Sequence, residues 1–216
     1  MKNLFLSVFT ALSLGLLFTS CGGGDDTPET PDPQSITGEI TVNTTWTNDR
    51  IWVLNQKVVV KSGVTLTIEA GTIIKGSEGQ GSLASALVIA RGGKIMAEGT
   101  ASEPIIFTSI NDNIAVGQTA GTNLTAADNG LWGGLLIMGN AKGSFTGDVS
   151  EFNIEGIPAS DSFGLYGGTN DADNSGVLKY VSIRHGGAEI GEGNEINGLT
   201  LGCVGSGTII QNIEVV

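Results

Sequence analysis

The sequence is short of charged, aromatic and cysteine residues, and each shortage excludes a class of protein. Charged residues make up 15% of the chain, well below the usual fraction of about 25%. Apolar residues rarely recur at helical spacing after residue 20, which argues against a helical fold. Two cysteines are too few for a disulfide scaffold. No Ser/His/Asp order, zinc-ligand spacing or phosphate-binding loop stands out, so the chain offers no ready catalytic motif.

Basic residues are especially scarce. The chain has 10 Lys and Arg against 22 Asp and Glu, which leaves a net charge of -12 and an isoelectric point near 4.3. A phosphate backbone would be repelled by this charge. We therefore expect no nucleic-acid partner and consider cations, neutral sugars or proteins instead.

What the chain does contain is glycine, at 34 positions, together with many Thr, Ile and Val residues. This composition is typical of short strands joined by tight corners. A unit of this kind occurs twice, as VVVKSGVTLTIEAGTIIKG at 58–76 and as ALVIARGGKIMAEGTASEPIIFTS at 86–109. The equivalent positions in our alignment are Leu66 with Leu87, Ile68 with Ile89 and Gly71 with Gly92 at a step of 21, and Ile73 with Ile95 at a step of 22.

A repeat of this length, with several short strands per unit, is typical of a solenoid. One unit cannot bury its apolar residues alone, so successive units must stack. We therefore predict an all-β fold, a parallel β-helix over 58–216. Alternate residues of a strand face opposite sides, so Val58, Leu66 and Leu87 should point inward while Thr65 should face solvent.

Two excursions interrupt the repeat, at 111–130 and roughly at 148–176. Insertions at a corner leave the stacking surface intact, and binding sites are expected on them. The open end of a solenoid must also be covered. We predict that 36–57 is an N-terminal cap. Trp46 and Trp52 lie in this segment, where they either complete the cap or form a platform that stacks on sugars.

The N-terminus has the pattern of a targeting signal. The sequence MKNLFLSVFTALSLGLLFTSC has one Lys, an apolar stretch and two small residues before Cys21. The apolar stretch is too short to span a bilayer and fits a signal peptide, which we assign to 1–20. A Cys directly after a small residue resembles the lipobox of bacterial lipoproteins. This resemblance implies that Cys21 is the mature N-terminus and carries acyl chains; the alternative is an ordinary signal with an incidental Cys.

Residues 21–35 form the next segment, and after Cys21 it holds three Gly, three Pro and four acids. It has no large apolar side chain to bury, so we predict a disordered tether. Acidic residues directly after a lipidated Cys resemble the surface-export signals of Bacteroidetes-type lipoproteins. The resemblance implies a protein anchored by lipid in the bacterial outer membrane and facing outside the cell.

The rest of the chain carries five stretches that point to one family: WTNDRIWVLNQKVVVKSGVTLTIEAGTIIKG, GGKIMAEGTASEPIIFTS, WGGLLIMGNA, YGGTNDADNSGVLKYVSIRHGG and NEINGLTLGCVGSGTIIQNIEVV. Together they resemble Bacteroidetes-type surface lipoproteins with a right-handed parallel β-helix, over nearly all of 40–216. More distantly, the architecture is similar to that of pectate lyases. In this family the chain usually continues into further coils, and ours stops at Val216 within a strand, so we expect a fragment. The family has no settled catalytic motif, so the resemblance implies a fold and not an activity.

One loop has the spacing of a cation site. Asp171, Asp173 and Ser175 place side-chain oxygens at alternating positions before a Gly, which is how a calcium loop collects its ligands. Ser182 stands where an EF-hand needs a bidentate Glu, so the loop is no EF-hand. It is either a Ca²⁺ site or an Asx-rich turn that introduces the next strand.

Three residues are candidates for acid-base chemistry. A calcium-dependent lyase needs a basic group beside the cation to abstract a proton, and Lys179 or Arg184 would be that base. His185 is the single histidine, and a lone histidine is more often a structural hydrogen-bonding residue.

Candidate ligand-binding residues are the aromatic ones on or near the second excursion, because aromatic rings stack on sugars. They are Trp132, Tyr166 and Tyr180, with Arg184 beside them. Packing within the core or the loops is the alternative for all three rings.

Taken together, these features favour a surface-anchored, non-enzymatic β-helix that binds a glycan or a protein. One alternative is a calcium-dependent polysaccharide lyase or hydrolase. The other is an adhesin or a structural stalk.

Overall fold

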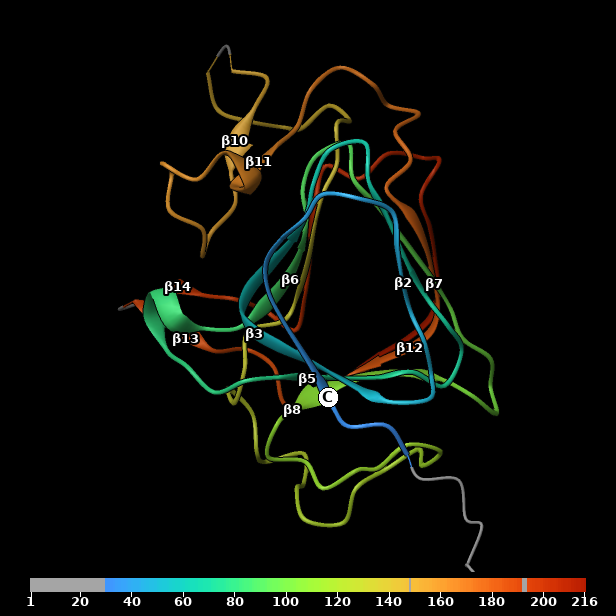
Figure 1. Cartoon of the computed structure of the whole chain (residues 1–216). Coiled ribbons are helices and arrows are strands. Elements are labelled where there is room, and N and C mark those ends of the chain that lie inside the picture. Colours follow the sequence, from blue (N-terminus) through green and yellow to red (C-terminus); the bar gives the residue numbers. More distant parts are fainter. Residues whose placement is uncertain (1–29, 148, 192–193) are drawn as a thin grey trace, which may run out of the picture.

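Short strands from successive turns of the chain lie side by side in the computed structural model, which describes residues 30–147, 149–191 and 194–216 (Figure 1). The strands are β1 (Gln34–Ile40), β2 (Thr44–Trp46), β3 (Ile51–Val60), β4 (Thr65–Ile68), β5 (Ile73–Gly76), β6 (Ala86–Ile89), β7 (Lys94–Glu98), β8 (Ile105–Ser109), β9 (Leu135–Met138), β10 (Phe152–Asn153), β11 (Leu165–Tyr166), β12 (Gly176–Ile183), β13 (Glu189–Gly191), β14 (Asn194–Glu195), β15 (Leu199–Gly202) and β16 (Ile209–Val215). Two short 3-10 helices, η1 (Gly81–Leu83) and η2 (Ser162–Gly164), accompany them. Across these described ranges, no helix has the length and apolar character needed to cross a membrane.

Twelve of the strands form one sheet that winds around the interior on three faces. Face 1 holds the second half of β1, the second half of β3, and β6, β9 and β15. Face 2 holds β2, β4, β7 and the first halves of β12 and β16. Face 3 holds the first halves of β1 and β3, then β5, β8 and the second halves of β12 and β16. All of these pairs are parallel, which confirms the predicted parallel β-helix (Figure 1).

The interior is filled by residues that alternate inward along each strand. On face 1, Val58, Leu87, Leu135 and Leu199 are partners in register on four successive coils. The first three of them are fully buried. Burying one such side chain contributes about 1.5–3 kcal/mol. A column of this kind therefore stabilises each coil through the coils above and below it.

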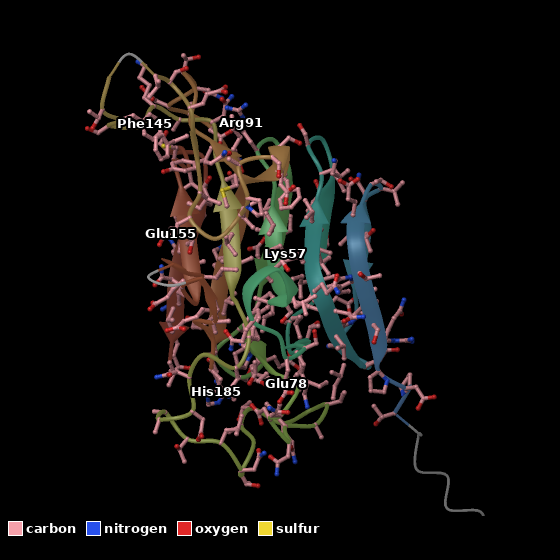
Figure 2. All side chains as sticks on the ribbon, turned by 90° about the vertical axis from the view of Figure 1, so that its left-hand side faces the viewer. Lys57, Glu78, Arg91, Phe145, Glu155 and His185 are labelled. Atoms are coloured by element: carbon pink, nitrogen blue, oxygen red, sulfur yellow. The ribbon has the colours of Figure 1, made fainter. Side chains whose placement is uncertain are left out.

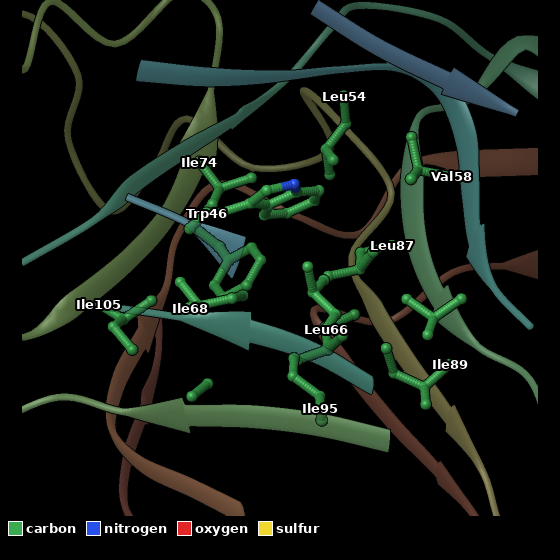
Figure 3. Close-up of a cluster of buried hydrophobic side chains, with 14 of the residues drawn as sticks. Trp46, Leu54, Val58, Leu66, Ile68, Ile74, Leu87, Ile89, Ile95 and Ile105 are labelled. Carbon is green, nitrogen blue, oxygen red and sulfur yellow. The ribbon is translucent and has the colours of Figure 1, made fainter. Parts of the chain in front are cut away.

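The predicted repeat is present, but its register was wrong. The segments 58–76 and 86–109 do stack, yet Leu66 pairs with Ile95 and Val58 pairs with Leu87, at a step of 29. Leu66 and Leu87 therefore lie on different faces, although both are buried in the same core (Figure 3). The alignment at a step of 21 therefore paired residues of one face with residues of a different face of the following coil. Strands flanked by glycine look alike on every face, so local similarity did not distinguish them.

Residues 36–57, which we predicted to form a cap, belong to the same sheet as the later coils. β1 pairs with β3, and β2 pairs with β4, in parallel. Trp46 is fully buried, Trp52 is nearly so, and their rings stack with centroids 5.4 Å apart. Neither ring offers a face to a sugar, so the alternative of a stacking platform was wrong. The predicted tether also ends early, because β1 begins at Gln34.

Both predicted excursions lie outside the parallel sheet, and each covers one of its outer faces. The segment 111–130 lies against face 3, where Ile114 packs on Ile73 and Ile106. The Lys75 ammonium, on the outside of face 3, donates a hydrogen bond to the Asp112 carbonyl oxygen at 2.7 Å. Burial lowers the pKa of Lys75, and the neighbouring Asp112 opposes that shift.

Face 1 is covered in the same way. The second excursion folds back over it with β10 and β11, and the β13–β14 hairpin lies beside them (Figure 1). The buried residues of this layer are Val59, Val88, Leu136 and Met138 from the sheet and Ile154, Ile157 and Ile196 from the covering segments. This outer apolar layer was not predicted, because the strand pattern predicted only an inner core.

The stacked core predicts which side chains contribute most to the free energy of unfolding. Replacing Leu66, which is fully buried, by Ala should lower the free energy of unfolding by about 2–5 kcal/mol, because it leaves a cavity inside the coil. The side chain of Thr67 in the same strand points outward, so Thr67→Ala should change the free energy of unfolding by about 0.5 kcal/mol or less. Urea denaturation measures both. Equal losses for the two variants would contradict the assigned inward and outward faces.

Candidate functional site

The outer side of face 1 carries three adjoining grooves, between the segments that cover it. Figure 2 labels Lys57 and Glu155, which lie on this side of the molecule and line the grooves. The main groove has a volume of about 1020 Å³, and its polar lining residues are Gln80, Asn129, Glu189, Glu195 and Asn197. The Lys57 groove, of about 400 Å³, lies between Lys57 and residues 154–158. The aromatic groove, of about 420 Å³, is lined by Phe152, Asn153, Glu155, Tyr166, Glu195 and Asn197, with Ile154 and Thr200.

The three grooves adjoin one another, because they share lining residues. Glu155 lines both the Lys57 groove and the aromatic groove. Glu195 and Asn197 line both the aromatic groove and the main groove. Gly81 joins the main groove to the Lys57 groove. The three grooves therefore lie next to one another, and their lining residues come from several coils.

The main groove arises at a single corner of the solenoid. The chain passes from face 3 to face 1 through residues 77–85, 110–134 and 184–198 on three successive coils. Each of these segments is longer than a tight turn, and each contributes to the groove wall. Because coils stack in register, insertions at one corner are placed next to one another in space.

The aromatic and Lys57 grooves are completed by the second excursion, which is fixed by polar contacts. One nitrogen of the Arg91 guanidinium, Nη1, lies 2.6 Å from a Glu151 carboxylate oxygen and donates to the Gly167 carbonyl oxygen at 2.6 Å. Gly202 on β15 has no Cβ, and the Tyr166 ring lies 2.7 Å from where one would be. Any side chain at 202 would therefore displace this ring from the sheet.

Two aromatic rings, Phe152 and Tyr166, line the aromatic groove, and Phe145 packs against both of them. Phe145 stacks on Phe152 with ring centroids 5.8 Å apart and meets Tyr166 edge-on at 5.6 Å. Burial raises the pKa of Tyr166, with a smaller contribution from Cys203. Phe152 is 56% exposed. A large apolar ring held in place and open to solvent is a surface on which a ligand can stack.

The grooves are acidic. Glu155, Glu189 and Glu195 line them, and none of the three forms an ion pair with a described residue. Lys57 is the basic lining residue, and its ammonium donates to the Ser82 carbonyl oxygen at 3.0 Å. Burial lowers the pKa of Lys57, while Asp161 opposes the shift. Ligands that bring hydrogen-bond donors and no negative charge match this lining best.

The predicted calcium ligands lie outside these grooves. The Asp171 carboxylate faces Lys142 Nζ at 3.5 Å, and the Asp173 carboxylate accepts a hydrogen bond from Ser175 Oγ at 3.1 Å. The Asn174 side chain accepts from the Gly176 amide at 2.9 Å, so the loop does contain an Asx turn. Within the described ranges, no three His, Cys, Asp or Glu side chains are grouped so that they could hold a metal ion.

The three candidates for acid-base chemistry are engaged elsewhere. Lys179 forms an ion pair with Glu98 on face 2 at 3.1 Å. Arg184 donates to Ser182 Oγ and to the Thr119 carbonyl oxygen at 2.8 and 2.9 Å. His185 is 7% exposed, and its Nδ1 lies 2.6 Å from the backbone oxygen of residue 128. These contacts join neighbouring segments of the solenoid and give each side chain a structural role.

The predicted aromatic ligand-binding residues are not brought together. Trp132 is fully buried, stacks on Phe107 and donates to the Arg184 carbonyl oxygen at 2.8 Å, so it packs in the core and offers no face to a ligand. Tyr180, 37% exposed, lies where β12 bends from face 2 to face 3. Of the four predicted residues, Tyr166 alone lines a groove on face 1. Cys21 lies outside the described residues.

Sequence reasoning missed Phe152 and Asn197, which share the aromatic groove with Tyr166, and it pointed to Glu155 and Glu195 only as members of an acidic stretch. One signal was available, since 148–195 is rich in acids and has few basic residues. Which of those acids meet an aromatic ring depends on how two separate excursions fold over one face, and the spacing along the chain does not show this.

Comparison with known proteins gives one match. A family model described as a pectate-lyase like beta helix domain matches residues 38–216. No curated protein and no solved structure matches the chain. The matched range contains all three faces and the grooves of face 1.

The Arg91 contacts make a testable prediction. Arg91→Ala removes both of its bonds to the second excursion and should increase chymotrypsin cleavage after Phe152 or Phe163 about fivefold, the change that ~1 kcal/mol of local stability produces. Lys94→Ala, an exposed basic residue on β7, is the matched control. Limited proteolysis followed by mass spectrometry measures the rates. An unchanged rate in Arg91→Ala would show that apolar packing alone holds the excursion.

Proposed function

The chain belongs to the pectate-lyase-like β-helix family, and from this premise we propose that it is a surface-anchored, non-enzymatic scaffold whose face 1 binds a glycan chain. The row of adjoining grooves, lined by several coils, supports this proposal, because it suits an extended polymer better than a small molecule. Family membership supports the scaffold and leaves the activity open.

Exposed Phe152 is the observation that carries the glycan proposal. Sugar rings present faces of C–H groups, and these carry a small positive charge that is attracted to the negative face of an aromatic ring. The neighbouring groups are two carboxylates, two amides and the Thr200 hydroxyl, which can accept from and donate to sugar hydroxyls. A ring beside several hydrogen-bonding groups is the lining expected of a sugar subsite.

Binding is favoured over lyase chemistry by the contacts of the candidate bases. Lys179 and Arg184 are held by Glu98 and by Ser182. No hydrogen bond or ion pair in the described part of the chain connects them to Asp171 or Asp173. A lyase would need such groups to converge beside its substrate.

The anchoring part of the proposal is supported by the N-terminal sequence. An apolar stretch of signal-peptide length ends at small residues and Cys21, and an acidic segment rich in Gly and Pro follows. Acyl chains on Cys21 would attach the protein to the bacterial outer membrane, since each buried CH₂ contributes about 0.8 kcal/mol. The acidic segment would then hold the β-helix outside the cell.

Lipidation of Cys21 can be tested by metabolic labelling. Cys21→Ala should abolish incorporation of radiolabelled palmitate and move the protein out of the membrane fraction. Cys203→Ala, which removes the other cysteine of the chain, should leave both unchanged. If Cys21→Ala still incorporates palmitate and stays in the membrane fraction, the lipoprotein assignment is refuted.

Glycan binding can be tested on an array of polysaccharide fragments, followed by calorimetry on the best ligand. Phe152→Ala should weaken binding roughly 3- to 10-fold, the change expected from losing one aromatic contact. Tyr180→Asn removes an exposed ring at the bend of β12, and Asn tolerates the positive φ found there; it should bind like the unmodified chain. If the chain binds no glycan and a protein partner is captured on face 1 instead, the protein is an adhesin and the glycan proposal is wrong.

A further inference from the structure

We infer that the grooves of face 1 select glycans that carry free ammonium groups. This inference rests on the proposed function and names its ligand class. Three observations support it: the charge of the lining, the position of the carboxylates beside the exposed ring, and the pairing of two of these carboxylates across a hairpin.

The main and aromatic grooves are lined by acceptors. Their charged lining residues are Glu155, Glu189 and Glu195, without a basic residue among the described lining. An ionised carboxylate accepts hydrogen bonds and cannot donate them. A uronate would add further acceptors and negative charge to the same space. An ammonium group brings three donors and a positive charge, so it is the complementary group.

The carboxylates are placed where a stacked sugar would present its substituents. The aromatic groove brings Glu155 and Glu195 together with Phe152 and Tyr166, so a ring held on Phe152 lies in the same hollow as both carboxylates. The same two residues also join this groove to its neighbours. A polymer that runs along the adjoining grooves would therefore meet a carboxylate on either side of the aromatic groove.

The β13–β14 hairpin places a third carboxylate, that of Glu189, next to one of these two. Glu189 and Glu195 are directly opposite one another in this antiparallel pair. Like charges in opposite positions destabilise a strand pair. A cationic group bound in the main groove would relieve this repulsion, whereas an anionic one would increase it.

Lys57 limits where the ammonium groups can lie. It lines the third groove with Glu155, and its ammonium is already directed to the Ser82 carbonyl oxygen. We therefore place the ammonium-binding positions in the aromatic and main grooves and not beside Lys57.

The test compares four hexamers by calorimetry with the full chain: glucosamine, N-acetylglucosamine, galacturonate and lysine. The glucosamine hexamer has both rings and charge, and it should bind about tenfold more tightly than its acetylated counterpart, with the galacturonate hexamer weakest. Glu155→Gln and Glu195→Gln should each weaken glucosamine binding roughly three- to fivefold and weaken binding of the acetylated hexamer less, so that the preference for the amino hexamer falls. Glu103→Gln makes the same charge change outside the grooves of face 1 and is the matched control.

The outcomes separate this inference from the proposed function. If the acetylated and amino hexamers bind equally and the Glu variants change neither, a glycan site exists but the ammonium inference fails. If the lysine hexamer binds as tightly as the glucosamine hexamer and Phe152→Ala has no effect, the interaction is charge attraction alone and both fail. Salt screens charge attraction, so glucosamine binding should weaken as NaCl rises from 50 to 500 mM. The loss of affinity should be larger in the unmodified chain than in Glu155→Gln.

Discussion

Parallel pairing in register is the constraint on which the rest of this molecule depends. Each coil has too few apolar residues to fold alone, and it becomes stable because its inward side chains lie against those of the coils on either side. The column that includes Leu87 and Leu135 on face 1 shows this directly. The rigidity of the face comes from this stacking, and so does the placement of every segment that leaves the sheet.

The same constraint explains why the grooves are on face 1. Insertions at equivalent corners of successive coils must lie next to one another, so three insertions between face 3 and face 1 form one wall. The second excursion leaves from the other end of face 1 and folds back over it, because Val88 and Leu136 on the outside of the sheet are apolar and need a cover. The grooves are the spaces between these covers.

The predictions that succeeded were those that depend on local pattern. Gly-flanked, β-branched strands identified the parallel β-helix, and breaks in that pattern identified both excursions. The register failed because Leu66 and Leu87 occupy similar local sequences on different faces. Trp132 was misassigned because an aromatic residue beside an excursion can point into the core as readily as out, and here it stacks on Phe107.

By itself, the sequence determined the all-β composition, the solenoid and the acidic charge, since each is a property of neighbouring residues or of the whole composition. The lipidated N-terminus stays a prediction from the sequence. Only the tertiary structure decided that Phe152, Glu155 and Glu195 share one groove and that Lys179, Arg184 and His185 support the scaffold. The physical reason is that coils of unequal length stack side by side. Distance along the chain then no longer indicates distance in space, and the site is made by contacts between coils.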